Sequence, residues 1–291
     1  MNVYEIVTKE ILAKLEQEIV PWQMPWKRKA FDHNGVSKRR YRGVNTILTS
    51  MRGFAESDWY TLRQMRELGV DLKENQHSSI VCFYKVIEKE PTETEKKMES
   101  MGFITLDDRK HYMLRYYGVF NREQIDGLPE LPKTGDELDF KPVEACEKVI
   151  EEFRDRPSIE YGGARAFYSP MQDIVKVPKR ENFISIDEYY STLFHELVHS
   201  TGHEKRTGRT KDGHDGFGGK EYAREELCAE IGSAILCRHC GITKTIDNSV
   251  SYIDNWKKAL LDDAKCVVLA AQRAQRAVDY ILNIKNQQEE A

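Results

Sequence analysis

Apolar residues recur every three or four positions in several stretches of the chain, a spacing that places them on one face of a helix. Residues 3–19 form the first such stretch, and Pro21 is expected to end that helix. Residues 44–69 predict two short helices, of which the second contains Trp59 and ends at Gly69. Further helices are predicted over residues 143–155, over the stretches around 186–202 and 222–232, and in a tail from about 249 to 286.

Other apolar segments have the composition of strands. Residues 80–87 and 113–120 are rich in β-branched and aromatic residues, so we expect them to pair. The highly charged stretch 88–111 between them is expected to form the mobile tip of a hairpin. Two further short strands are predicted, one around Gly162 and Gly163 and one over residues 173–177.

A break in the pattern divides the chain into two domains. Residues 128–142 are rich in glycine and proline and are predicted to be a linker. Residues 1–127 combine helices and strands, whereas residues 143–291 are mostly helical with a small sheet. The predicted fold class is therefore α+β with two domains, which 291 residues can supply with a core each.

Composition excludes some classes of protein. The formal net charge is only −4, so no global charge points to nucleic acid. No stretch approaches the roughly 18 apolar residues of a membrane span, and Tyr4, Glu5 and Lys9 interrupt any signal peptide. We therefore expect a cytoplasmic protein that has no membrane partner, whose six cysteines stay reduced.

His195, Glu196, Leu197, Val198 and His199 form an H-E-x-x-H motif in a predicted helix. Histidines four positions apart share a helical face, so both imidazoles can bind one metal ion. Glu196 projects from nearly the same side and is the candidate general base. Zn²⁺ lowers the pKa of a bound water from about 15.7 to roughly 7, and a nearby carboxylate then takes the proton. The alternative is a core helix with two incidental histidines.

A catalytic zinc ion usually has a third protein ligand. The metzincin spacing fails, because Lys205 stands where the third histidine would fall and His203 comes two residues early. Glu226, in a later predicted helix, is the predicted third ligand, and Glu230 is predicted to orient a ligand histidine. This order resembles the gluzincin site of thermolysin-like peptidases. The alternatives are that Glu225 or Glu230 is the ligand, or that these acids merely form a solvated face of the helix. A site of two histidines and one glutamate also accepts Mn²⁺ or Co²⁺.

The charge of the chain is unevenly placed. Between Pro21 and Arg66, ten basic residues face three acidic ones, and aromatic residues are interleaved with them. Basic side chains neutralise phosphates, and aromatic rings stack on unpaired bases with about 1–3 kcal/mol per base. Because duplex bases already stack on one another, this combination favours single strands. The alternative is that the tryptophans belong to the core and the charges are merely solvated.

Several segments together resemble the ArdC-type antirestriction proteins. In the first half they are residues 3–26 with two Pro-Trp pairs, YRGVN at 41–45, WYTLRQ at 59–64 and VFNREQ at 119–124. The second half, with residues 195–203 and 222–230, resembles the zincin-like peptidase domain fused to them. A related N-terminal module occurs in plasmid primases of the TraC type, but no primase domain is expected here.

The resemblance implies an N-terminal domain that binds single-stranded DNA and a C-terminal domain like a metallopeptidase. Such proteins are carried by plasmids and conjugative elements and help incoming DNA to escape host restriction. The local charge and the resemblance together select candidate DNA-binding residues, namely Trp22, Trp26, Arg40, Tyr41, Arg42 and Asn45.

In the second half, we expect His195, His199 and Glu226 to hold zinc beside an unidentified protein or peptide substrate. Residues 173–177 are the expected edge strand on which such a peptide lies extended. Tyr222 or Tyr252 is the candidate for stabilising an oxyanion.

Two other functions compete with this one. The chain could coat single-stranded DNA and use its metal domain only structurally, or it could be a general cytosolic peptidase. The last reading leaves the tryptophan- and arginine-rich segment unexplained. The oligomeric state is not fixed by the sequence.

Overall fold

The computed structural model describes residues 2–22, 31–88, 93–101, 110–130, 141–209, 219–242 and 249–284. Helices and small sheets alternate along the chain, which confirms the predicted mixture of α and β structure. In order, the elements are α1 (Val3–Leu15), β1 (His33–Asn34), α2 (Val44–Ser50), β2 (Asp58–Thr61), α3 (Leu62–Leu68), β3 (Asp71–Leu72), β4 (Ser79–Glu88), α4 (Glu93–Ser100), β5 (Lys110–Asn121), η2 (Arg122–Gln124), β6 (Ile125–Asp126), α5 (Pro142–Glu152), β7 (Ser158–Tyr161), β8 (Phe167–Ser169), β9 (Ile174–Val177), η3 (Arg180–Asn182), α6 (Ile186–Ser200), α7 (Lys220–His239), α8 (Ser249–Asp262) and α9 (Cys266–Ile281).

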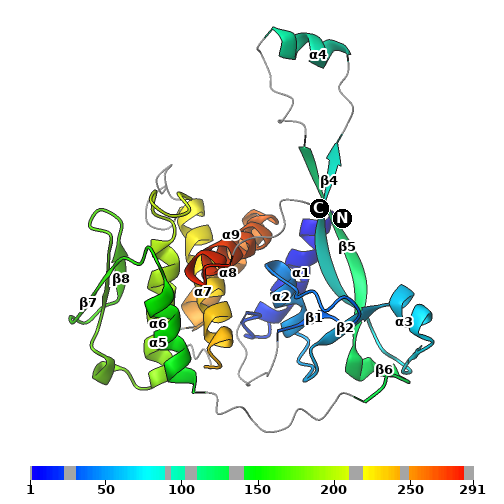
Figure 1. Cartoon of the computed structure of the whole chain (residues 1–291), viewed down its shortest axis with the longest axis horizontal. Helices are drawn as coiled ribbons and strands as arrows, with labels where there is room; N and C mark the ends of the chain where they lie inside the picture. The colour runs from blue at the N-terminus through cyan, green and yellow to red at the C-terminus, as the bar shows by residue number, and fades with distance from the viewer. Residues whose placement is uncertain are drawn as a thin grey trace.

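The N-terminal sheet has the strand order β1-β2-β5-β4. Its two long strands, β4 and β5, pair antiparallel from Ser79 opposite Val119 to Glu88 opposite Lys110, so the predicted pairing is confirmed and longer than expected. In Figure 1 this ribbon projects away from the rest of the molecule. Helix α4 forms part of the charged stretch predicted as a hairpin tip, while residues 89–92 and 102–109 lie outside the described residues.

Three predicted helices have different limits in the structure. Trp59 lies in strand β2, opposite Asn121. Helix α3 starts only after Thr61, because the Thr61 hydroxyl caps the helix by accepting the Gln64 N–H. Helix α1 ends at Leu15, well before Pro21. The predicted C-terminal helix is two helices, since the Asp263 carboxylate accepts the Lys265 N–H at 2.9 Å in the turn between α8 and α9.

The small sheet of the second half has the order β7-β9-β8. Strand β9 pairs in parallel with β7 on one side and antiparallel with β8 on the other. The expectation that residues 173–177 form an edge strand is therefore wrong. Two short segments, β7 and β8, pair with β9 on either side, and the alternate residues Val175 and Val177 of β9 are buried on the face that α6 contacts. The edges of this sheet are β7 and β8.

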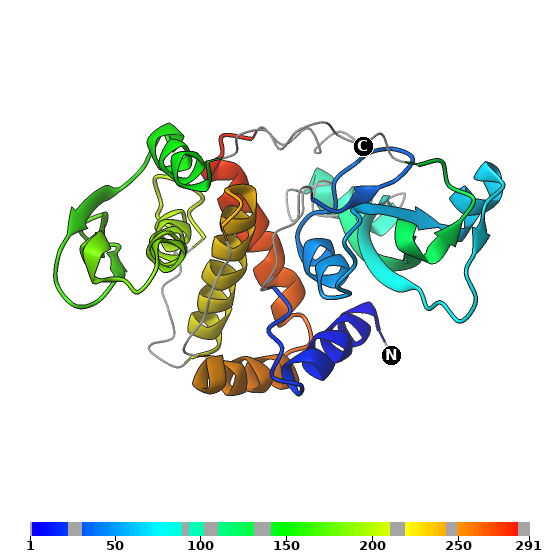
Figure 2. The ribbon, with the colours of Figure 1, turned by 90° about the horizontal axis from the view of Figure 1, so that it is seen from below.

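One apolar core joins the two halves of the chain. Helix α1 contacts α8, and α2 contacts α9, so N-terminal helices pack on C-terminal ones. Figure 2 shows α1, in dark blue, beside α8, in orange. Polar links add to this packing, since Arg42 pairs with Asp279 of α9 and Arg238 of α7 with Asp32. The division into domains at residues 127 and 143 stays a prediction, and residues 131–140 of the predicted linker lie outside the described residues.

Candidate metal centre

Helix α6 carries the H-E-x-x-H motif. Ser185 caps its first turn by accepting the Glu188 N–H at 3.1 Å, and acids in that turn favour a helix N-terminus. Leu193, Leu197 and Val198 are fully buried on the face turned to the core. The two histidines lie on another side of the helix, and their side chains are 17% and 15% exposed.

Helix α7 crosses α6 in close contact. A Cβ atom on Gly232 would lie only 2.8 Å from a methyl carbon of Val198, so only glycine allows this approach. One residue further on, the Ser233 hydroxyl donates a hydrogen bond of 2.7 Å to the Ser191 carbonyl. These contacts fix α7 against the motif helix, and the carboxylates of the two turns before Gly232 consequently face the histidines.

The Nε2 atoms of His195 and His199 are 3.0 Å apart. Both approach the Glu226 carboxylate, at 3.6 Å for His195 and 3.5 Å for His199. Ligand atoms of these three residues all lie within 4.8 Å of one another, and they are the group in the described part of the chain that could hold a metal ion. Tetrahedral zinc with bonds of about 2.0–2.2 Å needs ligand atoms roughly 3.3–3.5 Å apart, so the residues present fit such an ion.

The other two acids of α7 contact the remaining ring nitrogens. Glu230 lies 3.1 Å from Nδ1 of His195, and Glu225 lies 3.1 Å from Nδ1 of His199. A carboxylate at Nδ1 holds that proton in place and leaves Nε2 free to bind a metal. The three acids that were candidates for the third ligand thus have different positions, and Glu226, the preferred one, faces both Nε2 atoms.

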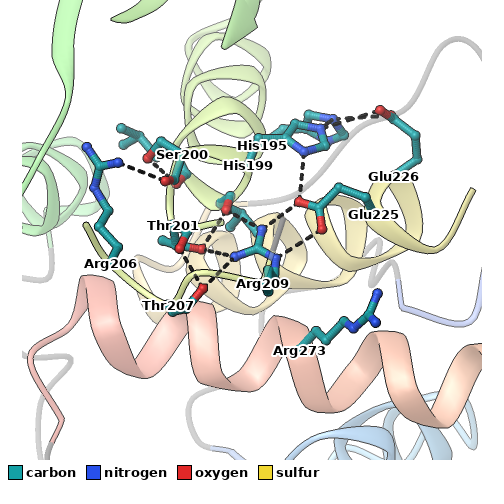
Figure 3. Close-up of polar contacts among 12 residues, drawn as sticks. His195, His199, Ser200, Thr201, Arg206, Thr207, Arg209, Glu225, Glu226 and Arg273 are labelled. Carbon is teal, nitrogen blue, oxygen red and sulfur yellow. Dashed lines mark hydrogen bonds and ion pairs between the residues drawn. The ribbon is translucent and has the colours of Figure 1, made fainter. Parts of the chain in front are cut away.

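Arg209 is a site residue that sequence reasoning missed. Its guanidinium binds Glu225 through two hydrogen bonds, of 2.6 Å and 3.0 Å, and donates another of 2.7 Å to the Val198 carbonyl. It also contacts the Thr201 hydroxyl. Figure 3 shows Arg209 between the end of the motif helix and Glu225. No local motif marks this arginine, because its partner Glu225 lies 16 residues later in the chain, on α7.

Burial and charge pairing set the pKa values of this cluster. Burial alone lowers the pKa of His195, but hydrogen bonds to Glu226 and Glu230 outweigh it and raise the pKa to about 10. Burial alone raises the pKa of Glu225, but His199 and Arg209 lower it to about 2. Burial likewise opposes the charge of Glu226, and the histidines lower its pKa below the usual value. These shifts favour the ionised forms of Glu225 and Glu226 and the protonated form of His195.

The remaining candidates of the second half lie at different distances from this cluster. Glu196 is buried next to His195 on α6. Tyr222 is partly buried on α7, one turn before Glu226. Tyr252 is in α8, and its side chain lies outside the described residues. His203 lies in the turn after α6 and accepts the Lys205 N–H at its Nδ1, away from the group of metal-binding atoms.

Three of the candidate DNA-binding residues are buried. Trp22 packs in the core against Trp256, with ring centroids 4.9 Å apart. Tyr41 belongs to a second buried cluster, and its burial raises the pKa of its hydroxyl to about 12. The Asn45 side chain bonds both backbone groups of Cys82, at 2.6 and 2.7 Å. In these positions the side chains support the fold and present no surface on which a base could stack.

The other three candidates differ in exposure. Arg40 is exposed, with its guanidinium 5.3 Å from the centre of the Phe31 ring. Arg42 is 35% exposed and pairs with Asp279. Trp26 lies outside the described residues. Among the described candidates, Arg40 is thus the most accessible.

Comparison with known protein families matches both halves of the chain. Residues 1–120 match the N-terminal domain of the anti-restriction factor ArdC, and residues 144–273 match a zincin-like metallopeptidase family. In the described part of the chain, no helix is both long and apolar enough to cross a membrane.

Individual proteins are similar over almost the whole chain. A DNA primase TraC of Escherichia coli is 33% identical over 98% of this chain, but the chain spans only 20% of the length of that primase. A second TraC is 32% identical, and the chain spans 27% of it.

Two solved structures are similar in sequence and fold. The metal-free antirestriction protein ArdC from plasmid R388 is 32% identical, with a TM-score of 0.75 and 97% of each chain covered. The Mn(II)-bound structure of that protein is 31% identical, with a TM-score of 0.75, 99% of this chain and 100% of the other covered.

Proposed function

Because this chain belongs to the ArdC family of antirestriction proteins, we propose that it protects incoming DNA of a mobile element from host restriction. The N-terminal half binds single-stranded DNA, and the second half is a zinc-dependent peptidase that acts on a protein or peptide. The observation that carries the enzymatic part is the convergence of His195, His199 and Glu226, each histidine being oriented by its own carboxylate.

His195, His199 and Glu226 would hold the ion through two nitrogens and one oxygen. A bound divalent metal ion supplies a Lewis acid that polarises a carbonyl group and lowers the pKa of water to about 7. A related antirestriction protein has been solved in a Mn(II)-bound form, which supports a divalent ion as a ligand of this chain. We propose Zn²⁺ as the resident ion, because two imidazoles and one carboxylate form a typical set of ligands for catalytic zinc.

Glu196 is the general base of the proposed reaction. It follows His195 directly and is 8% exposed, so its carboxylate is shielded from bulk water. A carboxylate in this position accepts a proton from the attacking water and can return it to the leaving nitrogen of a peptide. Tyr222, on the helix that carries Glu226, is the candidate for hydrogen bonding to the oxyanion that develops.

The position of β9 changes the proposal for peptide binding. Both edges of β9 are already paired with strands. In the described part of the chain, β8 pairs only with β9, and it packs against the motif helix α6. We propose that an extended substrate adds to the free edge of β8 through backbone hydrogen bonds.

The metal content of purified variants tests the assignment of the ligands. Glu226→Ala should lose the bound ion, whereas Glu196→Gln should retain one ion per chain and lose hydrolysis. Glu225→Gln, which removes an orienting carboxylate, should retain the stoichiometry with roughly 10–100-fold weaker affinity. Elemental analysis after dialysis measures the first two, and full metal content in Glu226→Ala would contradict this assignment.

A further inference from the structure

The β4–β5 ribbon has two faces, which its antiparallel register defines. Phe83 lies opposite Arg115 and Val81 lies opposite Tyr117, so these four residues share one face. Tyr116 lies opposite Cys82 on the other face, which packs on the main core through Cys82. Adjacent tyrosines of β5 thus point to opposite sides of the sheet.

The first face is covered only in part. Near β2, Val81 and Val119 are buried with Tyr41 and Trp59. Farther along the ribbon the cover ends, and Phe83 is 44% and Tyr117 49% exposed. We call Phe83, Arg115 and Tyr117 the aromatic face.

The two rings of the aromatic face form a platform. Their centroids are 5.7 Å apart and their planes are inclined by 64°. Arg115 beside them is exposed. Among the side chains of this face described on the two strands, from 79 to 83 and from 114 to 121, there is no carboxylate. The aromatic face is therefore aromatic and cationic, and the described residues that β4 and β5 place on it carry no negative charge.

Further basic residues belong to the segment that precedes Tyr41 in the chain. Tyr41 is in the same buried cluster as Val81, which is the register partner of Tyr117. That segment contains exposed Lys38 and Arg40. Lys38 forms an ion pair with buried Asp58, and Arg40 lies over the Phe31 ring. The basic segment thus leads into the buried cluster to which Val81 of the ribbon belongs.

We propose that the aromatic face is where single-stranded nucleic acid lies, with unpaired bases against Phe83 and Tyr117 and a phosphate at Arg115. This assignment rests on the proposed binding of single-stranded DNA and gives it a location that the sequence candidates did not include. Aromatic rings accept the face of any base, and a guanidinium neutralises phosphate. In a duplex the bases stack on one another, so the rings distinguish single from double strands.

The chain offers a matched control for this surface. Tyr116 and Tyr117 are adjacent, identical in chemistry and similarly exposed, at 47% and 49%, but they lie on opposite faces. Fluorescence anisotropy with a labelled oligo(dT) of about 20 nucleotides compares Tyr117→Ala, Phe83→Ala and Tyr116→Ala in the full chain. We expect Kd to rise roughly 5- to 100-fold in each of the first two, and to remain within about twofold in Tyr116→Ala.

Arg115→Ala gives a second readout. Loss of one phosphate contact should reduce the slope of log K against log salt concentration by about 0.7 for a single strand. A variant that fails to fold would lose its circular dichroism spectrum as well as its oligonucleotide binding. Circular dichroism of each variant is therefore the control for folding.

The possible failures are distinct. If the wild type binds oligo(dT) and both Tyr117→Ala and Phe83→Ala bind equally well, the aromatic face is not the site, although the proposed function stands. If Tyr116→Ala weakens binding as much as Tyr117→Ala, the location is also wrong. If the wild type does not bind the oligonucleotide, the DNA-binding half of the proposed function fails together with its location. Equal binding of a duplex would contradict base stacking, because phosphate contacts alone would then account for the binding.

Discussion

Replacing Arg209 with methionine removes the guanidinium that holds Glu225 and keeps most of the apolar length of the side chain. Arg209 and Glu225 are 9% and 7% exposed, so the substitution leaves a carboxylate buried beside His199 without its cationic partner. It also removes the hydrogen bond to the Val198 carbonyl at the end of the motif helix. Stability and metal binding should therefore both change.

The expected magnitudes follow from these contacts. Removing one partner of a buried ion pair usually lowers the free energy of unfolding by about 3–5 kcal/mol. Losing the group that orients a ligand histidine weakens metal binding by about 10–100-fold. Arg209 acts on His199 only through Glu225, so we expect a loss of metal affinity near the lower limit, about tenfold.

Arg206 provides the matched control. Its side chain is 2% exposed, and it binds Asp173 through two hydrogen bonds of 2.8 and 2.9 Å. It contacts no carboxylate of the metal centre, as Figure 3 shows. Arg206→Met should lower the free energy of unfolding by about 3 kcal/mol and leave metal affinity within about twofold.

Urea unfolding of the metal-free proteins and competition with a chromophoric chelator measure the two quantities. Wild-type metal affinity in Arg209→Met would refute the reasoning, because it would mean that His199 is oriented without the Glu225–Arg209 pair. If Arg206→Met lost as much metal affinity as Arg209→Met, the loss in both variants would be explained by general destabilisation of the fold.

Three more predictions concern separate parts of the molecule. Metal affinity should rise up to about tenfold per pH unit between about pH 6.5 and 8, because His195, with a pKa raised to about 10 in the metal-free protein, must release its proton. Chelator competition at several pH values tests this. In the metal-free protein, protonated His195 also stabilises the fold, and this stabilisation should be lost as pH rises through 10. Asn45→Ala should lower the free energy of unfolding by about 2–4 kcal/mol, because both backbone groups of Cys82 lose their hydrogen-bond partner. A urea titration that finds a loss of less than about 0.5 kcal/mol would contradict the structural role of Asn45. Arg238→Met should destabilise by about 3 kcal/mol in thermal unfolding, because Asp32, which is 1% exposed, loses its ion pair between the two halves.

The metal centre was the part most readily predicted from sequence. The i, i+4 spacing of His195 and His199 is a local property of a helix, so it places both imidazoles on one face before any tertiary contact is known. Glu226 was preferred as the third ligand, but Glu225 and Glu230 remained alternatives to it. Their roles depend on how α7 crosses α6, and this is fixed by a contact between Gly232 and Val198 that no local pattern reveals.

The N-terminal half shows the limit of compositional reasoning. A tryptophan among arginines has the same local sequence whether it stacks on bases or on another tryptophan, and Trp22 packs against Trp256, which is far away in the chain. Trp59 has helical spacing to Leu62 and Met65, yet the Thr61 cap makes it part of a strand. The exposed Phe83 and Tyr117 lie in segments that read as ordinary buried strands, so their exposure required the structure.

Transfer of a plasmid into a restricting host tests the central claim most directly, with wild-type protein and Glu196→Gln compared at matched expression. Glu196 is not a predicted metal ligand, so the substitution should preserve the fold, the bound ion and the binding of oligonucleotide. The account predicts that protection disappears in Glu196→Gln while all three properties are retained. Unchanged protection would contradict it, because the metal centre would then be dispensable for antirestriction and coverage of the entering strand would be sufficient.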